Sequence, residues 1–410
     1  MDIDTCGRQV QPEWMEFARN QKKSERKMTM NVEIQRNHPS DAADTRALWE
    51  EIFTEDSAAF LDYYYSVKTK DNQLQTIRTD GVLTAMIHWN PYPIRICGSE
   101  ADSCYLVAVA TKKEYRHRGQ MASLLKAGLR DCAKAQIPLV WLMPADPAIY
   151  EPFDFRYIYE KCEGKWPQSE ASVQASGGCS RQEVFPDSFR NSLKIRPLCP
   201  EEYAEAAAFL NRELERRYQV YTKRTPEYLA VTEAETQTEN GHAAGIFSFG
   251  ALVGIFSYWV EDTIILRELV TTPEYESGED RADLTAAVRS FFRAIPGLPE
   301  EITAITTGWL GERKPIIMAR PANLEALMTR MKAKRPRTLC VRVDDPILPE
   351  NDGCFLWQTG SAGSSWQSAP ADAVPDLSFT IAELTQWLFR EQREEFPELC
   401  PLRSFFNEIV

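Results

Sequence analysis

The sequence lacks the signatures of several protein classes. No segment approaches the roughly 18 to 20 consecutive apolar residues that span a bilayer, and Met1 to Met28 contains no apolar core of a secretory signal. The 47 basic residues are outnumbered by 60 acidic ones, and the net charge is −13. A nucleic-acid-binding protein needs a basic face to displace counterions. We therefore expect a cytoplasmic protein with no membrane and no nucleic-acid partner.

The usual spacings of metal ligands and disulfide partners are also missing. The ten cysteines include no C-x-x-C pair, and the four histidines are far apart in the sequence. Zinc sites and disulfide scaffolds both depend on close, regular spacings of such residues. The sequence thus predicts reduced, mostly buried thiols and no metal.

The length and the apolar content indicate more than one folded domain. With 410 residues, of which 43% are hydrophobic, the chain has enough material for about two to three domains. Patterned sequence begins near Asn31, and we expect residues 1–30 to form a flexible N-terminal extension.

Residues 31–165 alternate between helical and strand patterns. The Asp80-Gly81 pair between two apolar runs is a hairpin signal. Apolar residues from Met121 to Cys132 recur at the i, i+3, i+4, i+7 spacing of a helix. The predicted helices are 41–53, 57–68 and 121–135, and the predicted strands are 74–78, 82–89, 105–110 and 139–143.

Residues 166–318 begin with a Ser-, Gly- and Gln-rich linker and then repeat the order of the first stretch. This order predicts a diverged duplication of the first domain, although residue identities do not support it. The predicted helices are 201–218, one near Glu227 and 281–292, and the predicted strands are 245–249, 252–261, 264–270 and 302–306.

Residues 319–410 form a third stretch. We expect a loop at 360–375, which is rich in Ser, Ala, Gly and Pro. The apolar terminus, from Ser404 to Val410, predicts a docked chain end, because burying its side chains is favourable. The predicted helices are 323–332 and 381–390, and the predicted strands are 338–344 and 354–358.

The strongest chemical signal is a buried strand, Leu106 to Thr111, that leads into the turn Arg116-His117-Arg118-Gly119-Gln120 and a helix. Unpaired N–H groups at a helix N-terminus converge where a pyrophosphate can bind. Gly119 allows close approach of the backbone, and the two arginines can bind a phosphate bidentately. By itself this motif also fits an exposed basic turn.

A second segment, Leu142 to Phe155, reads LMPADPAIYEPFDF. Together the two segments resemble the GNAT acetyltransferases. The first is similar to their pyrophosphate loop, R/Q-x-x-G-x-G/A, and the second to their Y-x-x-F-G-F turn. The combination of V-A-T-x-x-E-Y-R-x-R-G-x-M with I-Y-x-x-F-x-F resembles the enhanced-intracellular-survival (Eis) branch. The segment from Val343 to Gly353 also resembles the third domain of that branch.

This resemblance implies an α/β (α+β) fold of two GNAT-like domains and a C-terminal sterol-carrier-like domain. The implied domains are a catalytic domain at 31–165, a linker and degenerate second GNAT-like domain at 166–318, and a sterol-carrier-like domain at 319–410. Family members form large oligomers, which implies a homo-oligomer. Two positions depart from the family pattern: Met121 replaces Gly or Ala, and Asp154 replaces Gly. A positive φ at Asp154 would be strained.

The resemblance also assigns roles to residues. Tyr150 is implied as the general acid that protonates the leaving thiolate, and the α-carboxylate of Val410 as the general base. Three glutamates and an aspartate between Glu274 and Asp280 replace the phosphate loop in the second domain, so one site is expected. The implied acetyl-CoA-binding residues are Val109, Ala110, Thr111, Arg116, His117, Arg118, Gly119, Gln120, Met121 and Asp146.

For the acceptor the sequence offers candidates only, which are Phe53, Tyr64, His88 and Glu408. We expect an acetyl-CoA-dependent N-acetyltransferase acting on a small cationic amine, of the aminoglycoside or polyamine type. Two alternatives remain open at this point: a protein lysine acetyltransferase, and a non-catalytic module that binds acyl-CoA or lipid.

Overall fold

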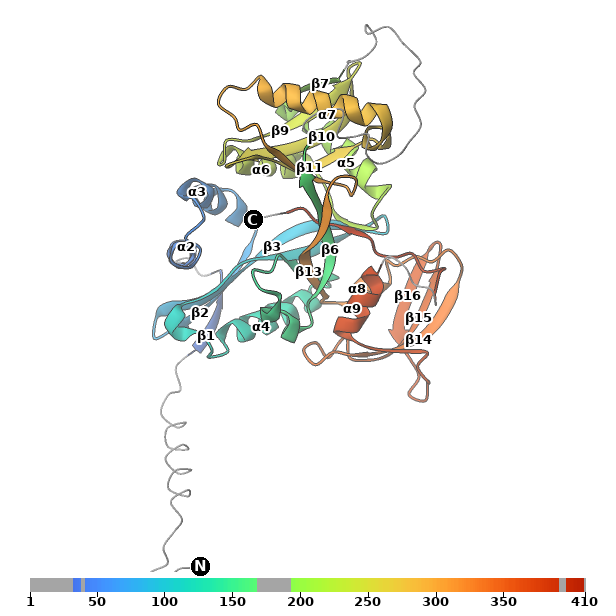
Figure 1. The fold of residues 1–410 in the computed structure, drawn as a ribbon. Coiled ribbons are helices and arrows are strands. Elements are labelled where there is room, and N and C mark those ends of the chain that lie inside the picture. Colours follow the sequence, from blue (N-terminus) through green and yellow to red (C-terminus); the bar gives the residue numbers. More distant parts are fainter. Residues whose placement is uncertain (1–31, 38–40, 168–192, 391–395, 409–410) are drawn as a thin grey trace, which may run out of the picture.

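The computed structural model describes residues 32–37, 41–167, 193–390 and 396–408 (Figure 1). The expected N-terminal extension at 1–30, nearly all of the Ser/Gly-rich linker and Val410 lie outside these residues. We call residues 32–165 the first repeat, 193–306 the second repeat and 322–390 the C-terminal domain. Residues 396–408 form the C-terminal segment.

The α-helices agree closely with the predicted positions, except that the helix expected at 323–332 is only five residues long. They are α2 (Asp41–Ile52), α3 (Ala58–Ser66), α4 (Gln120–Lys134), α5 (Tyr203–Glu215), α6 (Pro226–Gln237), α7 (Gly278–Arg293), α8 (Leu324–Met328) and α9 (Ile381–Phe389). Short 3-10 turns are η1 (Lys68–Lys70), η2 (Lys113–Tyr115), η3 (Pro147–Ile149), η4 (Glu151–Phe153), η7 (Pro200–Glu202) and η8 (Pro273–Glu276).

The strands of the first repeat are β1 (Val32–Arg36), β2 (Gln73–Thr79), β3 (Val82–Ile96), β4 (Ser99–Thr111), β5 (Leu139–Leu142) and β6 (Arg156–Lys165). Those of the second repeat are β7 (Leu193–Pro197), β8 (Val220–Thr222), β9 (His242–Ser248), β10 (Ala251–Val260), β11 (Ile264–Thr271) and β12 (Ile302–Thr306). The remaining strands are β13 (Glu312–Pro321), β14 (Arg337–Asp344), β15 (Gly353–Gly360), β16 (Gly363–Ser368), β17 (Leu377–Thr380) and β18 (Ser404–Phe405).

One continuous sheet runs through both repeats. Its strand order is β1-β2-β3-β4-β5-β13-β6-β12-β11-β10-β9-β7. Strand β6 pairs with β13 on one side and with β12 on the other, and so joins the two repeats (Figure 1). The sequence predicted neither β13 nor this junction. The boundary expected between residues 318 and 319 falls inside β13, which pairs with β5 and β6 of the first repeat.

The two repeats share backbone irregularities as well as element order. Each has a two-residue hairpin turn with positive φ at both positions, Asp80-Gly81 in the first repeat and Phe249-Gly250 in the second. Each also has a bulge in the strand before its long helix. The bulged residues are Ala108 in β4, with φ 50°, and Glu268 in β11, with φ 56°. Such bulges are retained structural features, and their match supports a duplicated fold.

The β3–β4 hairpin is longer than predicted. The strand expected to end at Trp89 continues to Ile96, through Pro91 and Pro93. Between Asn90 and Pro93, β3 pairs with β4 but has left β2 and has not yet met β8. A proline is tolerated where a strand has a free edge, because it has no N–H to donate. The sequence alone does not show this free edge, so it predicts that the strand ends at Trp89, before Pro91.

The C-terminal domain has a sheet of its own, in the order β16-β15-β14-β17. The expectation of a loop throughout 360–375 is wrong, because β16 lies within it and pairs with β15. Trp366 of β16 stacks on Phe355 with ring centroids 4.8 Å apart, which supplies the apolar contact that the Ser-rich sequence did not suggest.

The C-terminal segment docks on the rest of the chain as far as it is described. Strand β18 pairs with β8, which in turn pairs with the end of β3. Phe405 and Phe406 are buried, and Phe406 lies against Trp141 of β5 at 4.7 Å between ring centroids. The last described residues therefore sit beside the first repeat.

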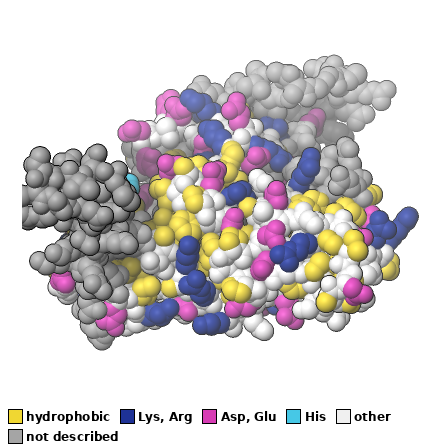
Figure 2. Space-filling view, turned by 90° about the horizontal axis from the view of Figure 1, so that it is seen from below, with side chains coloured by type: hydrophobic (Ala, Val, Ile, Leu, Met, Phe, Trp, Pro, Cys, Tyr) yellow, Lys and Arg dark blue, Asp and Glu magenta, His cyan; other side chains and the backbone are white. Residues whose placement is uncertain are grey.

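None of the described helices combines the length and apolar character needed to cross a membrane. On the face shown in Figure 2, the coloured Lys and Arg side chains are interspersed with Asp and Glu and with hydrophobic side chains. This face presents no extended field of one charge among the residues it shows.

Candidate active site

Strands β4 and β5 part at the centre of the first repeat. They are parallel and pair only from Cys104 to Leu106 of β4, whereas β4 continues to Thr111. From Val107 onward, β4 therefore has a described partner, β3, on one side only. The bulge at Ala108 lies in this free part of the strand. Peptide groups along such an edge can pair with an extended ligand as an added strand would.

The chain leaves β4 through η2 and enters α4 through a turn with two left-handed residues. His117 has φ 61° and Gly119 has φ 77°. Gly119 is the N-cap of α4, and no side chain caps this helix end. A Cβ built on Gly119 meets no atom within 4 Å, so the space in front of the first turn is open. The uncapped N–H groups and the open space fit a phosphate group.

The arginines of this turn are exposed and make local hydrogen bonds. The Nε of Arg116 donates to the carbonyl of Thr111 at 3.2 Å, and Arg118 donates to the carbonyl of Glu114 at 2.8 Å. Arg118 also lies 5.0 Å from the ring centroid of Tyr115. Both guanidinium groups are exposed at the start of α4, where they can bind a pyrophosphate. Gln120 is instead buried and bonds Thr79.

Tyr150 lies between η3 and η4, just beyond the parted end of β5. It is buried in the core that packs around α4, which includes Leu106, Leu142 and Phe155. Burial raises the pKa of its hydroxyl to about 12. The structure gives this hydroxyl no hydrogen-bond partner among the described residues. A neutral phenol whose hydroxyl donates to no described residue therefore lies near the opening between β4 and β5.

Two aspartates flank Tyr150. The carboxylate of Asp146 caps η3 by accepting from the N–H of Ala148 at 2.9 Å, so it is engaged locally. Asp154 adopts φ 66°, the positive value at which we expected strain from the departure from Gly. Burial raises the pKa of the Asp154 carboxyl.

Tyr64 and His88 lie deep in the first repeat rather than on an open surface. The hydroxyl of Tyr64 lies 3.2 Å from Nδ1 of His88 and donates to the Oδ1 of Asn90 at 3.2 Å. Burial lowers the pKa of His88 to about 3, so the ring is neutral. His88 pairs with Val107, next to the bulge in β4. Phe53 is half-buried and contacts Trp49, 5.8 Å between ring centroids.

Glu408 is also internal. Its carboxylate pairs with Arg224 at 3.0 Å and accepts from the hydroxyl of Tyr228 at 3.0 Å and from that of Thr222. Arg224 in turn pairs with Glu268, the bulged residue of β11, at 2.6 Å. Glu408 thus anchors the C-terminal segment, and its carboxylate is engaged by these internal partners. Val410, two residues on, lies outside the described residues.

A small acidic pocket lies where α3 of the first repeat meets α6 of the second. Its volume is about 190 Å³. Four carboxylates share it with one arginine, two threonines and two aromatic rings. The lining residues are Asp56, Phe60, Glu235, Thr236, Thr238, Glu239, Trp259, Glu261 and Arg267.

The electrostatics of this pocket favour a cation. Arg267 is neutralised by Glu235, 2.6 Å away. Burial, followed by repulsion from Glu261, Glu235 and Asp56, raises the pKa of Glu239. None of the residues that line this pocket is among the acceptor candidates named above from the sequence, and most of them belong to the second repeat. The charged pair Arg267-Glu268 inside the apolar strand Ile264–Thr271 was the signal that could have revealed this wall of the pocket.

The corresponding cleft of the second repeat is closed at its phosphate end. Glu276 takes the place of Arg116 in the turn before α7, and Arg217 pairs with it at 2.8 Å. Arg217 also donates to the carbonyl of Thr271 at 2.9 Å, and so covers the end of β11. Within the described chain, no group of three or more His, Cys, Asp or Glu side chains could hold a metal ion.

Comparison with known proteins agrees with this geometry. Residues 33–158 match the acetyltransferase (GNAT) domain family, and residues 302–395 match the sterol carrier protein domain family. The chain is therefore an acetyltransferase with a GNAT domain and a C-terminal sterol-carrier-protein domain. A GNAT domain uses acyl-CoA as its cosubstrate. The sequence has no significant match among curated proteins.

Several solved structures share the fold over most of the chain. A probable N-acyltransferase from Enterococcus faecalis is 17% identical, with a TM-score of 0.69, and covers 88% of this chain and 90% of its own. A GCN5-related N-acetyltransferase from Anabaena variabilis is 15% identical, with a TM-score of 0.68 and the same coverage. Eis1 from Mycobacterium abscessus is 13% identical, with a TM-score of 0.60, and again covers 88% and 90%.

We predict that Gly119→Ala raises the KM for acetyl-CoA at least several-fold. The new Cβ would occupy the open space before α4 and would strain a residue at φ 77°. Steady-state release of CoA thiol measures the effect. Gly250→Ala is the matched control, because Gly250 also has a positive φ and open space but lies in the second repeat. Equal KM values for the two variants would contradict the assignment of this turn.

Proposed function

We propose that this chain transfers the acetyl group of acetyl-CoA directly to an amine of a small cationic acceptor, of the aminoglycoside or polyamine type. The acidic pocket between α3 and α6 carries this proposal, since its four carboxylates face one neutralised arginine. Phe60 and Trp259 add aromatic surface, which favours bound cations. The outer parts of a long polyamine or aminoglycoside would extend beyond so small a pocket.

The acceptor pocket and the chain terminus share a wall. Arg267 of the pocket donates to the backbone carbonyl of Asn407 at 2.9 Å. Three residues of extended chain span roughly 10 Å, so the α-carboxylate of Val410 is within reach of an amine in this pocket. A carboxylate with an ordinary pKa near 3.5 is a poor base at neutral pH, and a buried site would raise that pKa.

The reaction forms a C–N bond and breaks the C–S bond of the thioester. The amine loses a proton to the terminal carboxylate. The leaving thiolate accepts a hydrogen bond from Tyr150 and takes up a proton through it, and Tyr150 recovers its own proton from solvent. A thiol, with a pKa near 8.5, is a stronger acid than a phenol whose pKa is raised to about 12. Tyr150 therefore acts first by donating a hydrogen bond to the developing thiolate. Its raised pKa keeps this donor protonated throughout the neutral range.

In this mechanism the turn at Arg116 to Met121 holds the pyrophosphate, and the free edge of β4 at Val109 to Thr111 aligns the pantetheine arm. The N–H groups near the Ala108 bulge are available to the thioester carbonyl, whose oxygen gains negative charge during the attack. His88, neutral and buried, lies on β3 and pairs with Val107 of β4 beside this edge. As in related assemblies, we propose a homo-oligomer in the cytoplasm.

Replacing Tyr150 by Phe is expected to lower kcat by roughly 10²-fold, the usual effect of losing an acid catalyst. The KM for acetyl-CoA should change little, because the ring and its packing remain. Turnover with a saturating amine gives kcat. Tyr157→Phe, at a nearby and partly exposed phenol, is the control. A kcat for Tyr150→Phe like that of the wild type would remove Tyr150 from the mechanism.

Adding three residues after Val410 is expected to abolish turnover while acetyl-CoA binding persists, because the α-carboxylate is displaced. Val410→Ala retains a carboxylate at the original position and should remain active. Thiol release and calorimetric binding of acetyl-CoA separate the two effects. Full activity of the extended chain would show that another group is the base.

For Glu239→Gln we expect a several-fold higher KM for a polyamine or an aminoglycoside and an unchanged KM for acetyl-CoA. Because the pKa of Glu239 is raised, the wild-type carboxylate gains its proton at a higher pH than usual. Acceptor binding should therefore weaken as the pH falls through that raised value, and the variant should lose this dependence. Glu227→Gln, at an exposed position in the first turn of α6, the helix that ends just before Glu239, is the control.

The same assay includes a lysine peptide. Turnover confined to the peptide would replace the small-molecule proposal by protein acetylation.

A further inference from the structure

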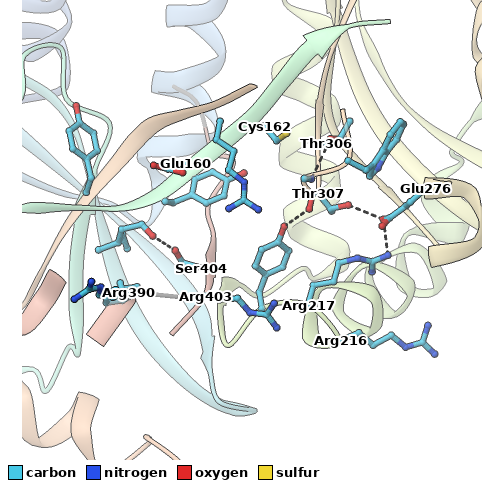
Figure 3. Close-up of a pocket in the computed structure, with 18 of the residues that line it drawn as sticks. Glu160, Cys162, Arg216, Arg217, Glu276, Thr306, Thr307, Arg390, Arg403 and Ser404 are labelled. Carbon is cyan, nitrogen blue, oxygen red and sulfur yellow. Dashed lines mark hydrogen bonds and ion pairs between the residues drawn. The ribbon is translucent and has the colours of Figure 1, made fainter. Parts of the chain in front are cut away.

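A second, larger cavity of the described chain plays no part in the proposed reaction. Its volume is about 760 Å³, within the range of small-molecule sites. It lies where the second repeat, β6 and α9 meet the C-terminal segment (Figure 3). Residues from all of these parts line it, including Arg216, Arg217, Arg313, Arg390 and Arg403.

The cavity gathers positive charge in a chain whose net charge is −13. Five arginines line it, against the two carboxylates of Glu160 and Glu276. In Figure 3, Arg390, Arg403, Arg217 and Arg216 follow one side, and Glu160 and Cys162 lie on the other. An anion bound to the arginine side would thus be separated from Glu160.

Part of this charge is already neutralised. Arg216 pairs with Glu213 at 3.0 Å, and Arg217 pairs with Glu276 at 2.8 Å. Thr307 also donates to Glu276, at 2.9 Å, so this carboxylate is held at the closed end of the cleft.

Arg390 and Arg403 are different. Both are exposed, and neither forms an ion pair with a carboxylate of the described residues. Within the described part of the chain, the Arg403 guanidinium donates a long hydrogen bond, 3.5 Å, to the neutral amide of Gln219. Arg390 ends α9 of the C-terminal domain, whereas Arg403 belongs to the C-terminal segment. Two guanidinium groups from separate elements, neither paired with a carboxylate that the structure describes, therefore line one cavity.

Two aromatic side chains, Trp309 and Tyr218, also line the cavity. The hydroxyl of Tyr218 donates to the carbonyl of Thr307 at 2.9 Å, which fixes its aromatic ring in the wall. A guanidinium group binds a phosphate or a carboxylate group bidentately. A ligand that contacts both Arg390 and Arg403 in this way must carry at least two such anionic groups.

We propose that this cavity binds a small organic polyanion that carries two or more phosphate or carboxylate groups. Arg390 and Arg403 are the principal contacts, with Arg216 and Arg217 extending the positive surface. The site lies in the cleft of the second repeat, beside the ion pair between Glu276 and Arg217. It is therefore separate from the turn at Arg116 to Gly119, which belongs to the first repeat. A bound polyanion would bridge the C-terminal domain, the C-terminal segment and the second repeat.

Calorimetric titration of the full-length protein tests this proposal, with inorganic pyrophosphate and citrate as probes. Arg116→Gln/Arg118→Gln serves as the background, because the candidate acetyl-CoA turn could also bind pyrophosphate. We expect binding in this background, weaker at higher salt, and a loss of roughly tenfold or more when Arg390→Gln and Arg403→Gln are added. Pyrophosphate binding alone would assign a phosphorylated ligand, and citrate binding alone a polycarboxylate.

Arg130→Gln is the matched control. It removes an exposed arginine of α4, a helix that is not among the elements lining the cavity. It should leave binding unchanged. The thermal unfolding midpoint of each variant checks that it is folded, and a bound probe should raise that midpoint in the background protein only. Absence of binding for both probes, or equal binding with and without Arg390 and Arg403, would overturn the proposal.

Discussion

The structure depends on one buried cluster of charges. Arg224 lies between Glu268, in the bulge of β11, and Glu408, near the chain end. These residues belong to three segments that are far apart in the sequence, and all are buried. Removing one partner of such a cluster leaves an uncompensated buried charge, at a cost of roughly 3–5 kcal/mol. The cluster therefore specifies where the C-terminal segment lies, and with it the wall that this segment shares with the acidic pocket.

The continuous sheet gives this cluster a rigid frame. Strand β6 joins both repeats, and β13 returns from the second repeat to lie between β5 and β6. The opening between β4 and β5 and the pocket between α3 and α6 are thus held by one sheet rather than by two hinged domains. In the second repeat, Glu276 and Arg217 close the equivalent phosphate end. The two copies of the fold have therefore diverged. The first carries the candidate catalytic site, and the second contributes residues to the wall of the acidic pocket.

Local signals predicted much of this fold. The Asp80-Gly81 turn, the apolar period of α4 and the strand–turn–helix at Arg116 to Gly119 are set by neighbours in the sequence, and the structure has all three. Longer-range features were missed. Pro91 and Pro93 suggested a strand end, whereas the strand continues along a free edge. The Ser-rich β16 is a strand because of Trp366 and its pairing with β15.

The sequence by itself determined the positions of most helices and of several strands, the candidate phosphate-binding turn and the family resemblance, because these depend on residues within about one helix or hairpin of each other. Only the tertiary structure decided that Glu408 is an internal anchor, that Glu235 and Glu239 face Asp56 across two repeats, and that Arg390 and Arg403 share a cavity. Each of these relations joins residues that are distant in the chain. Their proximity follows from strand order and packing, which no local pattern encodes.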